Sequence, residues 1–130
     1  MPRVALVVDD SMLIRHTVCR LLETHGFEVE TATNGLEAMA LLDSRLPDLI
    51  VTDLQMPKMT GRELITELKR RNETKTIPLV VISGRESGFD GSEPRADYCI
   101  HKDIDIQSQL ERALNDMRES APAKTHPATS

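Results

Sequence analysis

The 130-residue chain has very few aromatic residues: two Phe, one Tyr and no Trp. Its core must therefore be built from aliphatic side chains. A basic surplus is also missing, because 16 Lys and Arg stand against 21 Asp and Glu, which gives a net charge of −5. A surface that binds nucleic acid usually needs excess positive charge to neutralise phosphates, so nucleic acid is not an expected partner.

Long apolar runs are missing as well. No stretch approaches the roughly 20 apolar residues of a membrane-spanning helix, and the first residues show no signal-peptide pattern. The two cysteines, Cys19 and Cys99, have neither metal-ligand spacing nor the pattern of a disulfide framework. We therefore expect a cytoplasmic protein with reduced thiols and no membrane insertion.

Two hydrophobic periods alternate along the chain. Short continuous apolar runs, typical of strands buried on both faces, occupy Val4–Val8, Leu49–Val51 and Leu79–Ile82. The segments between and after them carry apolar residues at helical spacing. Glu28–Thr31 alternates charged and β-branched residues, as a half-exposed edge strand would, and Cys99–His101 is a weaker candidate for the other edge. This order predicts a three-layer α/β domain whose five-stranded parallel sheet has helices on both faces.

Helix-start and helix-stop signals agree with this order. Asn34 and Thr60 are each followed three residues later by Glu, the capping-box pattern in which two side chains satisfy backbone N–H groups at the helix start. Gly26 stands where the first helix should end. Residues 1–119 are predicted to form the domain, and residues 120–130, rich in Ala, Pro, Ser and Thr, a disordered tail.

Polar residues follow the buried strands. Asp9 and Asp10 follow the first strand, Asp53 the third, Ser83 the fourth and Lys102 the fifth. The carboxyl ends of parallel strands lie along one edge of the sheet, so three carboxylates, a hydroxyl and an ammonium are predicted to converge there. Clustered carboxylates repel one another and favour an accompanying cation, and oxygen ligands without His or Cys favour Mg²⁺.

Each of these residues has an ordinary structural explanation when taken alone. An Asp or Ser after a strand is more often a helix cap than a ligand, which applies to Asp10 and to Ser11. A lone Lys at a strand end is usually solvated, and a lone Ser is usually a turn residue. The functional interpretation therefore depends on the combination of all five residues at the ends of different strands.

The same residues resemble the receiver domains of two-component response regulators, and the similarity runs from about Val4 to Met117. The Asp53 segment, with Met-Pro and then Gly at their usual offsets, is its most specific part. The motifs that carry the resemblance are Val8-Asp9-Asp10-Ser11 with Arg15, Pro47-Asp48-Leu49-Ile50-Val51-Thr52-Asp53-Leu54-Gln55-Met56-Pro57, Gly61, Ser83 and Lys102.

The resemblance implies a flavodoxin-like fold with strand order 2-1-3-4-5. It implies that Asp53 accepts a phosphoryl group from a phosphohistidine on a sensor histidine kinase or phosphotransfer protein. Mg²⁺ would be the cofactor, held by Asp10, Asp53 and the backbone carbonyl of Gln55, while Asp9 would act mainly through water.

Two further site residues follow from the same resemblance. Ser83 and Lys102 would hold oxygens of the phosphoryl group on Asp53. The change would then be passed on through contacts with an unidentified downstream protein.

Three features depart from the family pattern. Lys102 is followed by Asp103 where family members have Pro after a cis peptide bond, and we expect a trans bond because a non-proline cis bond costs about 2.5–4 kcal/mol. Arg85–Pro94 contains two glycines and a proline without an apolar face, which predicts a short or irregular loop in place of the fourth helix. Cys99 stands where the family has its switch aromatic, and Tyr98, one residue earlier, belongs to the opposite face of the strand.

Several functions compete at this point. The favoured one is a stand-alone signalling module without a second domain, and its alternative is a receiver that only drains or relays phosphate. A Mg²⁺-dependent phosphohydrolase would need a second carboxylate shortly after the nucleophile, which Asp53-Leu54-Gln55 lacks. The chain is therefore not expected to be an enzyme, apart from catalysing its own phosphorylation and dephosphorylation. A flavin-binding flavodoxin would have Ser, Thr and Gly in place of Asp9 and Asp10.

Overall fold

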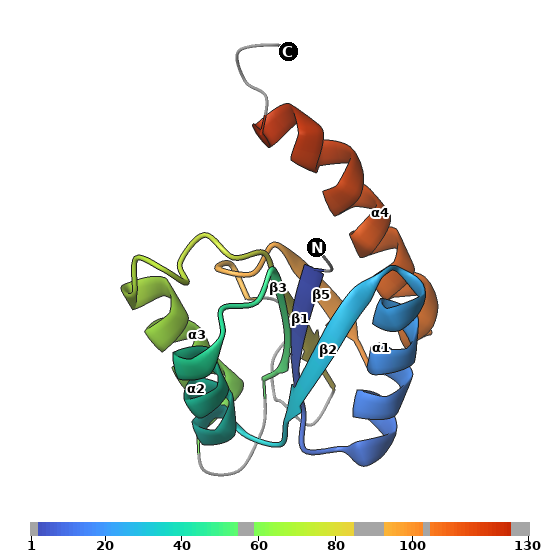
Figure 1. Cartoon of the computed structure of the whole chain (residues 1–130). Helices are drawn as coiled ribbons and strands as arrows, with labels where there is room; N and C mark the ends of the chain where they lie inside the picture. Colours follow the sequence, from blue (N-terminus) through green and yellow to red (C-terminus); the bar gives the residue numbers. More distant parts are fainter. Residues whose placement is uncertain (1–2, 55–58, 85–92, 103–104, 126–130) are drawn as a thin grey trace.

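The computed structural model describes residues 3–54, 59–84, 93–102 and 105–125, with side chains described as far as residue 117 (Figure 1). Five parallel strands form one sheet in the order β2-β1-β3-β4-β5, which confirms the flavodoxin-like order. The strands are β1 (Arg3–Val8), β2 (Phe27–Ala32), β3 (Leu49–Asp53), β4 (Leu79–Ser83) and β5 (Tyr98–His101). The helices are α1 (Met12–Thr24), α2 (Gly35–Ser44), α3 (Gly61–Arg70) and α4 (Ile106–Thr125).

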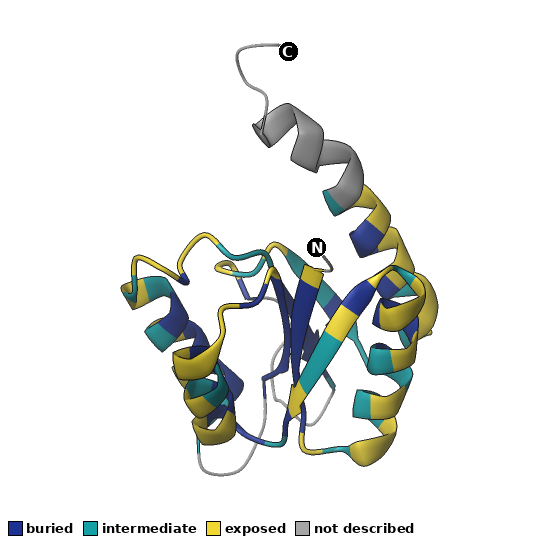
Figure 2. Ribbon diagram, in the orientation of Figure 1, coloured by how far each residue is buried: buried dark blue, intermediate teal, exposed yellow. Residues whose placement is uncertain are grey.

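Helices cover both faces of the sheet, with α1 and α4 on one face and α2 and α3 on the other (Figure 1). Successive residues of a strand point to opposite faces, so Val7 packs with α1 and α4 whereas Val8 packs with α2 and α3. Both core clusters are aliphatic except for Phe27. Figure 2 shows the buried residues concentrated on the strands and on the inward sides of the helices.

The strand β2 is an edge strand, as its alternating pattern predicts. Only its first and last residues are buried, and its charged side chains reach solvent. On this edge Arg45 Nη1 lies 2.9 Å from Glu28 Oε1 and 3.8 Å from Glu30 Oε2. The other edge is β5, where Tyr98 packs with the α1 and α4 layer and Cys99 with the α2 and α3 layer. These two side chains therefore belong to opposite faces, as predicted.

The helix starts follow the predicted capping residues, with one correction. Thr60 and Glu63 form the full capping box at α3. At α2, Asn34 Oδ1 accepts a hydrogen bond from the Glu37 N–H at 2.9 Å. The Glu37 carboxylate, however, accepts from the N–H and the hydroxyl of Thr33, at 2.7 and 2.8 Å, so the return bond is displaced by one residue. The stop at Gly26 is confirmed, because its φ of 88° is a left-handed conformation that favours glycine.

The chain enters β5 through a segment that is tied to α3. Glu93 is 4% exposed and accepts hydrogen bonds from Arg62 Nη1 at 2.9 Å and Arg95 Nη2 at 3.0 Å. Arg95 Nη1 also donates to Thr66 Oγ1 on α3 at 2.8 Å. We call these four side chains the Glu93 clasp. It fixes the described part of the β4–β5 connection against the α3 layer.

Several predictions concern residues at or beyond the limits of the description. Most of Arg85–Pro94 lies outside the described residues, and so does the peptide bond between Lys102 and Asp103. The described part of the connection from β4 to β5 contains no helix. The helix α4 continues to Thr125, past the predicted boundary at residue 119, while residues 126–130 lie outside the description. Within the described ranges, no helix has both the length and the apolar character that a membrane span requires.

Candidate functional site

Three carboxylates meet at the carboxyl edge of the sheet, as the strand order predicts. Asp53 ends β3, and Asp9 and Asp10 directly follow β1. One carboxylate oxygen from each of the three lies within 4.8 Å of the others. Asp9 and Asp53 are 1% and 3% exposed, whereas Asp10 is exposed. The sequence therefore places two charges in the interior beside a third at the surface.

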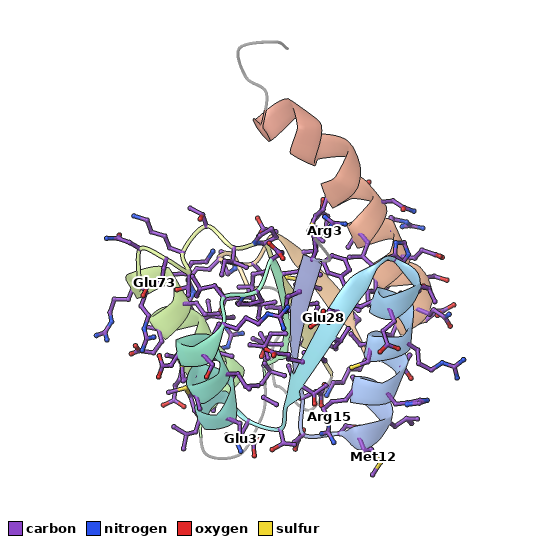
Figure 3. The ribbon with its side chains drawn as sticks, viewed as in Figure 1. Arg3, Met12, Arg15, Glu28, Glu37 and Glu73 are labelled. Carbon is purple, nitrogen blue, oxygen red and sulfur yellow. The ribbon has the colours of Figure 1, made fainter. Side chains whose placement is uncertain are left out.

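In Figure 3 this edge lies at the end of the molecule marked by Met12 and Glu37, the beginnings of α1 and α2, and Arg3 lies at the opposite end.

Asp9 has a pKa that is shifted far from its ordinary value. Its Oδ1 accepts a hydrogen bond from the Ser11 N–H at 2.8 Å. Its Oδ2 is buried and, among the described residues, has no hydrogen-bond partner, although the Lys102 ammonium lies 3.6 Å away. Burial raises the pKa of Asp9 from 3.8 to about 6, and the neighbouring charges of Asp53 and Asp10 add to this effect. A buried carboxylate oxygen that accepts no hydrogen bond from the described residues is a suitable ligand for a cation.

The turn that carries these carboxylates is held in place from both sides. Ser11 caps α1, since its Oγ accepts a hydrogen bond from the Ile14 N–H at 3.3 Å. Arg15, one turn into the helix, donates from Nη1 to the backbone oxygen of Asp9 at 2.7 Å. The ordinary structural explanation for Ser11 is thus correct, and its capping role is what orients the acidic turn.

Asp53 sits where the end of β3 meets the start of α3. A Cβ on Gly61 would lie 1.9 Å from the backbone oxygen of Asp53, so only glycine fits this contact. The Gly61 N–H donates to the Leu54 backbone oxygen at 3.1 Å, and this hydrogen bond holds the start of α3 against the residue that follows β3. The close approach explains why position 61 of this chain holds a glycine.

Lys102 supplies the positive charge of the site. Its Nζ donates to Asp53 Oδ2 at 2.9 Å. Burial lowers the pKa of this ammonium, but the hydrogen bond to Asp53 and the charges of the three carboxylates outweigh burial and raise the pKa above its usual value. Lys102 therefore remains charged at neutral pH.

Ser83 lies at the same edge, between Asp53 and Lys102. It ends β4, is 1% exposed, and follows Ile82, which pairs with Asp53 in the sheet register. The Ser83 backbone oxygen accepts a hydrogen bond from the Lys102 N–H at 2.8 Å. The structure thus brings together five of the six predicted site residues, while Gln55 lies outside the described residues.

One residue at this edge has no signal in the sequence. Gln109, on the first turns of α4, makes hydrogen bonds to both backbone groups of His101, which directly precedes Lys102. A glutamine among the polar positions of a helix is ordinary in composition. Only the fold shows that it contacts the strand end.

A five-stranded parallel sheet with an acidic cluster and a lysine at its carboxyl edge is the arrangement of a receiver domain. The family model of the response regulator receiver domain matches residues 5–115. The chain belongs to this family.

Three similar proteins illustrate the relationship. The phosphate regulon transcriptional regulatory protein PhoB of Rhizobium meliloti is 39% identical over 128 residues, covering 94% of this chain and 55% of the relative. Response regulator MprA of Mycobacterium sp. (strain KMS) is 31% identical over 125 residues, with 94% and 54% covered. The chain thus spans about half the length of these curated relatives. The solved structure of the chemotaxis response regulator CheY4 of Vibrio cholerae matches with a TM-score of 0.75 and 29% identity, covering 88% of this chain and 98% of that one.

Proposed function

We propose that this domain is a phosphoacceptor switch, in which Asp53 takes a phosphoryl group from a sensor histidine kinase or a phosphotransfer protein. One arrangement carries the proposal. The buried Asp53 carboxylate lies among the oxygens of Asp9 and Asp10, within 4.8 Å, and accepts a hydrogen bond from Lys102 at 2.9 Å. A nucleophilic carboxylate, a cation site and a fixed ammonium are what formation of an aspartyl phosphate needs.

Mg²⁺ is the proposed cofactor, and the residues present fit it. The donors are carboxylate oxygens, and Oδ2 of Asp9, which accepts no hydrogen bond within the described ranges, is available to a bound cation or its water. Asp10, Asp53 and the Gln55 backbone carbonyl would hold the ion directly, and Asp9 would act mainly through water. When bound, Mg²⁺ supplies positive charge that offsets the carboxylates and the phosphoryl oxygens.

The chain's own residues account for the transfer step. A carboxylate oxygen of Asp53 forms a bond to phosphorus while the P–N bond of the phosphohistidine breaks. The electron pair of that bond stays on the imidazole nitrogen, which takes up a proton from water. Lys102 neutralises charge on the phosphoryl oxygens, and the Ser83 hydroxyl contributes a hydrogen bond. Phosphoryl transfer depends mainly on this positioning and charge neutralisation, so no further catalytic group is needed.

The switch follows from a change of charge at Asp53, whose carboxylate loses its own negative charge and gains a charged phosphoryl group. After transfer, Asp53 is an acyl phosphate that carries about −1.5 to −2 charges further from the backbone than the original carboxylate. Lys102 and Ser83 turn toward the phosphoryl oxygens, and the ends of β4 and β5 move with them. We propose that a downstream protein recognises the altered surface, in the cytoplasm where the kinase donor acts.

A phosphotransfer profile tests this proposal. Purified histidine kinases carrying a radiolabelled phosphoryl group are mixed with the domain and Mg²⁺, and the label is followed to the domain. We expect rapid transfer from one or a few kinases and none to Asp53→Asn. Passage of the label on to a second histidine protein would assign a relay role instead. Failure of every kinase and phosphotransfer protein to label the wild type would contradict the proposed donor class.

A further inference from the structure

The strand β5 forms an edge of the sheet, and its last residue has a partner outside the sheet. Gln109 Oε1 accepts a hydrogen bond from the His101 N–H at 3.1 Å, and Gln109 Nε2 donates to the His101 backbone oxygen at 2.9 Å. One carboxamide therefore occupies both backbone groups of His101, as a neighbouring strand would. The contact joins the beginning of α4 to the end of β5.

This contact fixes the peptide unit that leads into Lys102. The carbonyl of that unit belongs to His101 and accepts from Gln109, while its N–H belongs to Lys102 and donates to the Ser83 oxygen at 2.8 Å. The unit is thus held by hydrogen bonds from two sides. Its orientation determines the direction in which the Lys102 side chain leaves the backbone.

Gln109 is itself held by its surroundings. Its Nε2 also donates to the Asp105 backbone oxygen at 3.2 Å. The next residue, Leu110, is fully buried in the core. The Asp105 carboxylate accepts hydrogen bonds from the N–H and the hydroxyl of Ser108, at 3.2 and 2.8 Å, which fixes the first turn of the helix. The carboxamide is therefore anchored to the core through a rigid helix start.

We infer that Gln109 is a positioning residue for Lys102: its carboxamide orients the His101–Lys102 peptide so that the Lys102 ammonium reaches Asp53. The inference rests on the proposed function of Lys102 in phosphoryl transfer. It also gives a physical reason why Lys102 is well placed although the next residue is Asp103 and not a proline. The orientation is fixed by a side chain from α4.

A double-mutant cycle on phosphorylation by acetyl phosphate with Mg²⁺ tests the inference. Gln109→Met keeps the approximate length of the side chain and removes its two hydrogen bonds to His101, together with the one to the Asp105 backbone oxygen. We expect this variant to be phosphorylated about twofold to tenfold more slowly, the effect of losing one or two hydrogen bonds. The matched control is Gln107→Met, because Gln107 is exposed on the same helix, and its rate should equal that of the wild type.

The cycle separates positioning from general destabilisation. In a Lys102→Ala background, Gln109→Met should slow phosphorylation no further, since the group that it orients is gone. An equal slowing in both backgrounds, or an unchanged rate in the single variant, would overturn the inference.

A second measurement decides the inference even if the wild type accepts no phosphoryl group, an outcome that would overturn the proposed function alone. In nitrogen-15 NMR at one fixed pH, the Lys102 ammonium signal should move toward that of a solvated lysine in Gln109→Met. It should stay in place in Gln107→Met. If Gln109→Met fails to fold, Gln109→Glu keeps the acceptor for the His101 N–H and removes the donor to its oxygen. The same shift of the Lys102 signal is then expected, and an unshifted signal would overturn the inference.

Discussion

The ammonium nitrogen of Lys102 lies 2.9 Å from Oδ2 of Asp53, although 49 positions separate the two residues in the chain. The parallel register of β3, β4 and β5 produces this contact. Asp53 pairs with Ile82, and Ser83 pairs with His101. The charges that the site needs are therefore brought together by sheet topology.

Replacing Lys102 by Ala should slow phosphorylation by a small acyl phosphate about 100-fold, the typical effect of removing one charged or donating group from a preorganised site. Lys102→Arg should recover part of the rate, because it keeps the charge but changes its geometry. Rates from intact-mass time courses measure both effects. If Lys102→Ala is phosphorylated as fast as the wild type, the lysine has no role in phosphoryl transfer.

The raised pKa of Asp9 predicts that the metal-free domain loses stability as pH rises. The folded state binds a proton on Asp9 up to about pH 6, whereas the unfolded state releases it near 3.8. The free energy of unfolding therefore decreases as the pH rises from 3.8 to about 6. Above pH 6 the stability cost of the buried Asp9 charge is fully present.

Asp9→Asn should remove that penalty. In chelator at pH 7, this variant should be more stable than the wild type by about 1–3 kcal/mol. The difference should shrink as pH falls toward 4. Urea unfolding at both pH values measures it, and a less stable Asn variant at pH 7 would show that Asp9 is not under electrostatic strain.

Gly61→Ala should both destabilise the domain and slow the phosphorylation of Asp53. The added methyl group would meet the Asp53 backbone oxygen at 1.9 Å, so the junction of β3 and α3 must move, at a cost of about 2 kcal/mol or more. Gly26→Ala is the matched control. Its φ is positive but nothing lies within 4 Å, so it should lose about 1 kcal/mol of stability and keep its phosphorylation rate. Equal rates in both variants would argue against a role for the close approach.

The Glu93 clasp should contribute to stability in a pH-dependent way. The hydrogen bond from Arg95 is the main cause that lowers the pKa of Glu93, and the charge of Arg62 adds to it. The contribution is therefore present above the usual Glu pKa and is lost as pH falls through the lowered value.

Glu93→Ala should destabilise the domain at pH 7 by about 1–2 kcal/mol, because it leaves two arginines without their buried partner. Glu67→Ala is the control, since its ion pair with Arg70 on the same helix is exposed, and it should change stability by less than about 0.5 kcal/mol. Thermal unfolding compares the two variants. A Glu93 variant as stable as the control would show that the clasp does not hold the segment before β5.

The apolar pattern predicted the parallel sheet and the edge at which the polar residues meet, whereas the strand order came from the resemblance to receiver domains. Buried parallel strands appear in a sequence as continuous apolar runs, as Val4–Val8 does, and the carboxyl ends of parallel strands share one edge of the sheet. The sequence also correctly predicted the helix start at Thr60 and the helix end at Gly26. At Asn34 the same pattern predicted the cap but missed that Glu37 bonds to Thr33, because spacing does not fix which of two adjacent N–H groups a long side chain reaches.

The contacts of Gln109 and Glu93 could not be predicted from the sequence. Gln109 and Glu93 are common residues in polar segments, and nothing in their neighbours indicates a partner. Their contacts depend on where α4 and α3 lie relative to β5, which is set by packing of the whole core. The burial of Asp9 Oδ2, without a hydrogen bond from any residue that the structure describes, likewise depends on the packing of the whole fold. Sequence reasoning identified the acidic cluster and its charge repulsion, but not the burial that raises the pKa of Asp9.

The most direct test of the account is the intact mass of the domain after incubation with Mg²⁺ and acetyl phosphate. We predict one phosphoryl adduct on the wild type, suppressed by a chelator and absent from Asp53→Asn. A wild-type mass that stays unchanged under a donor concentration that phosphorylates a control receiver would contradict the claim that Asp53 is a phosphoacceptor.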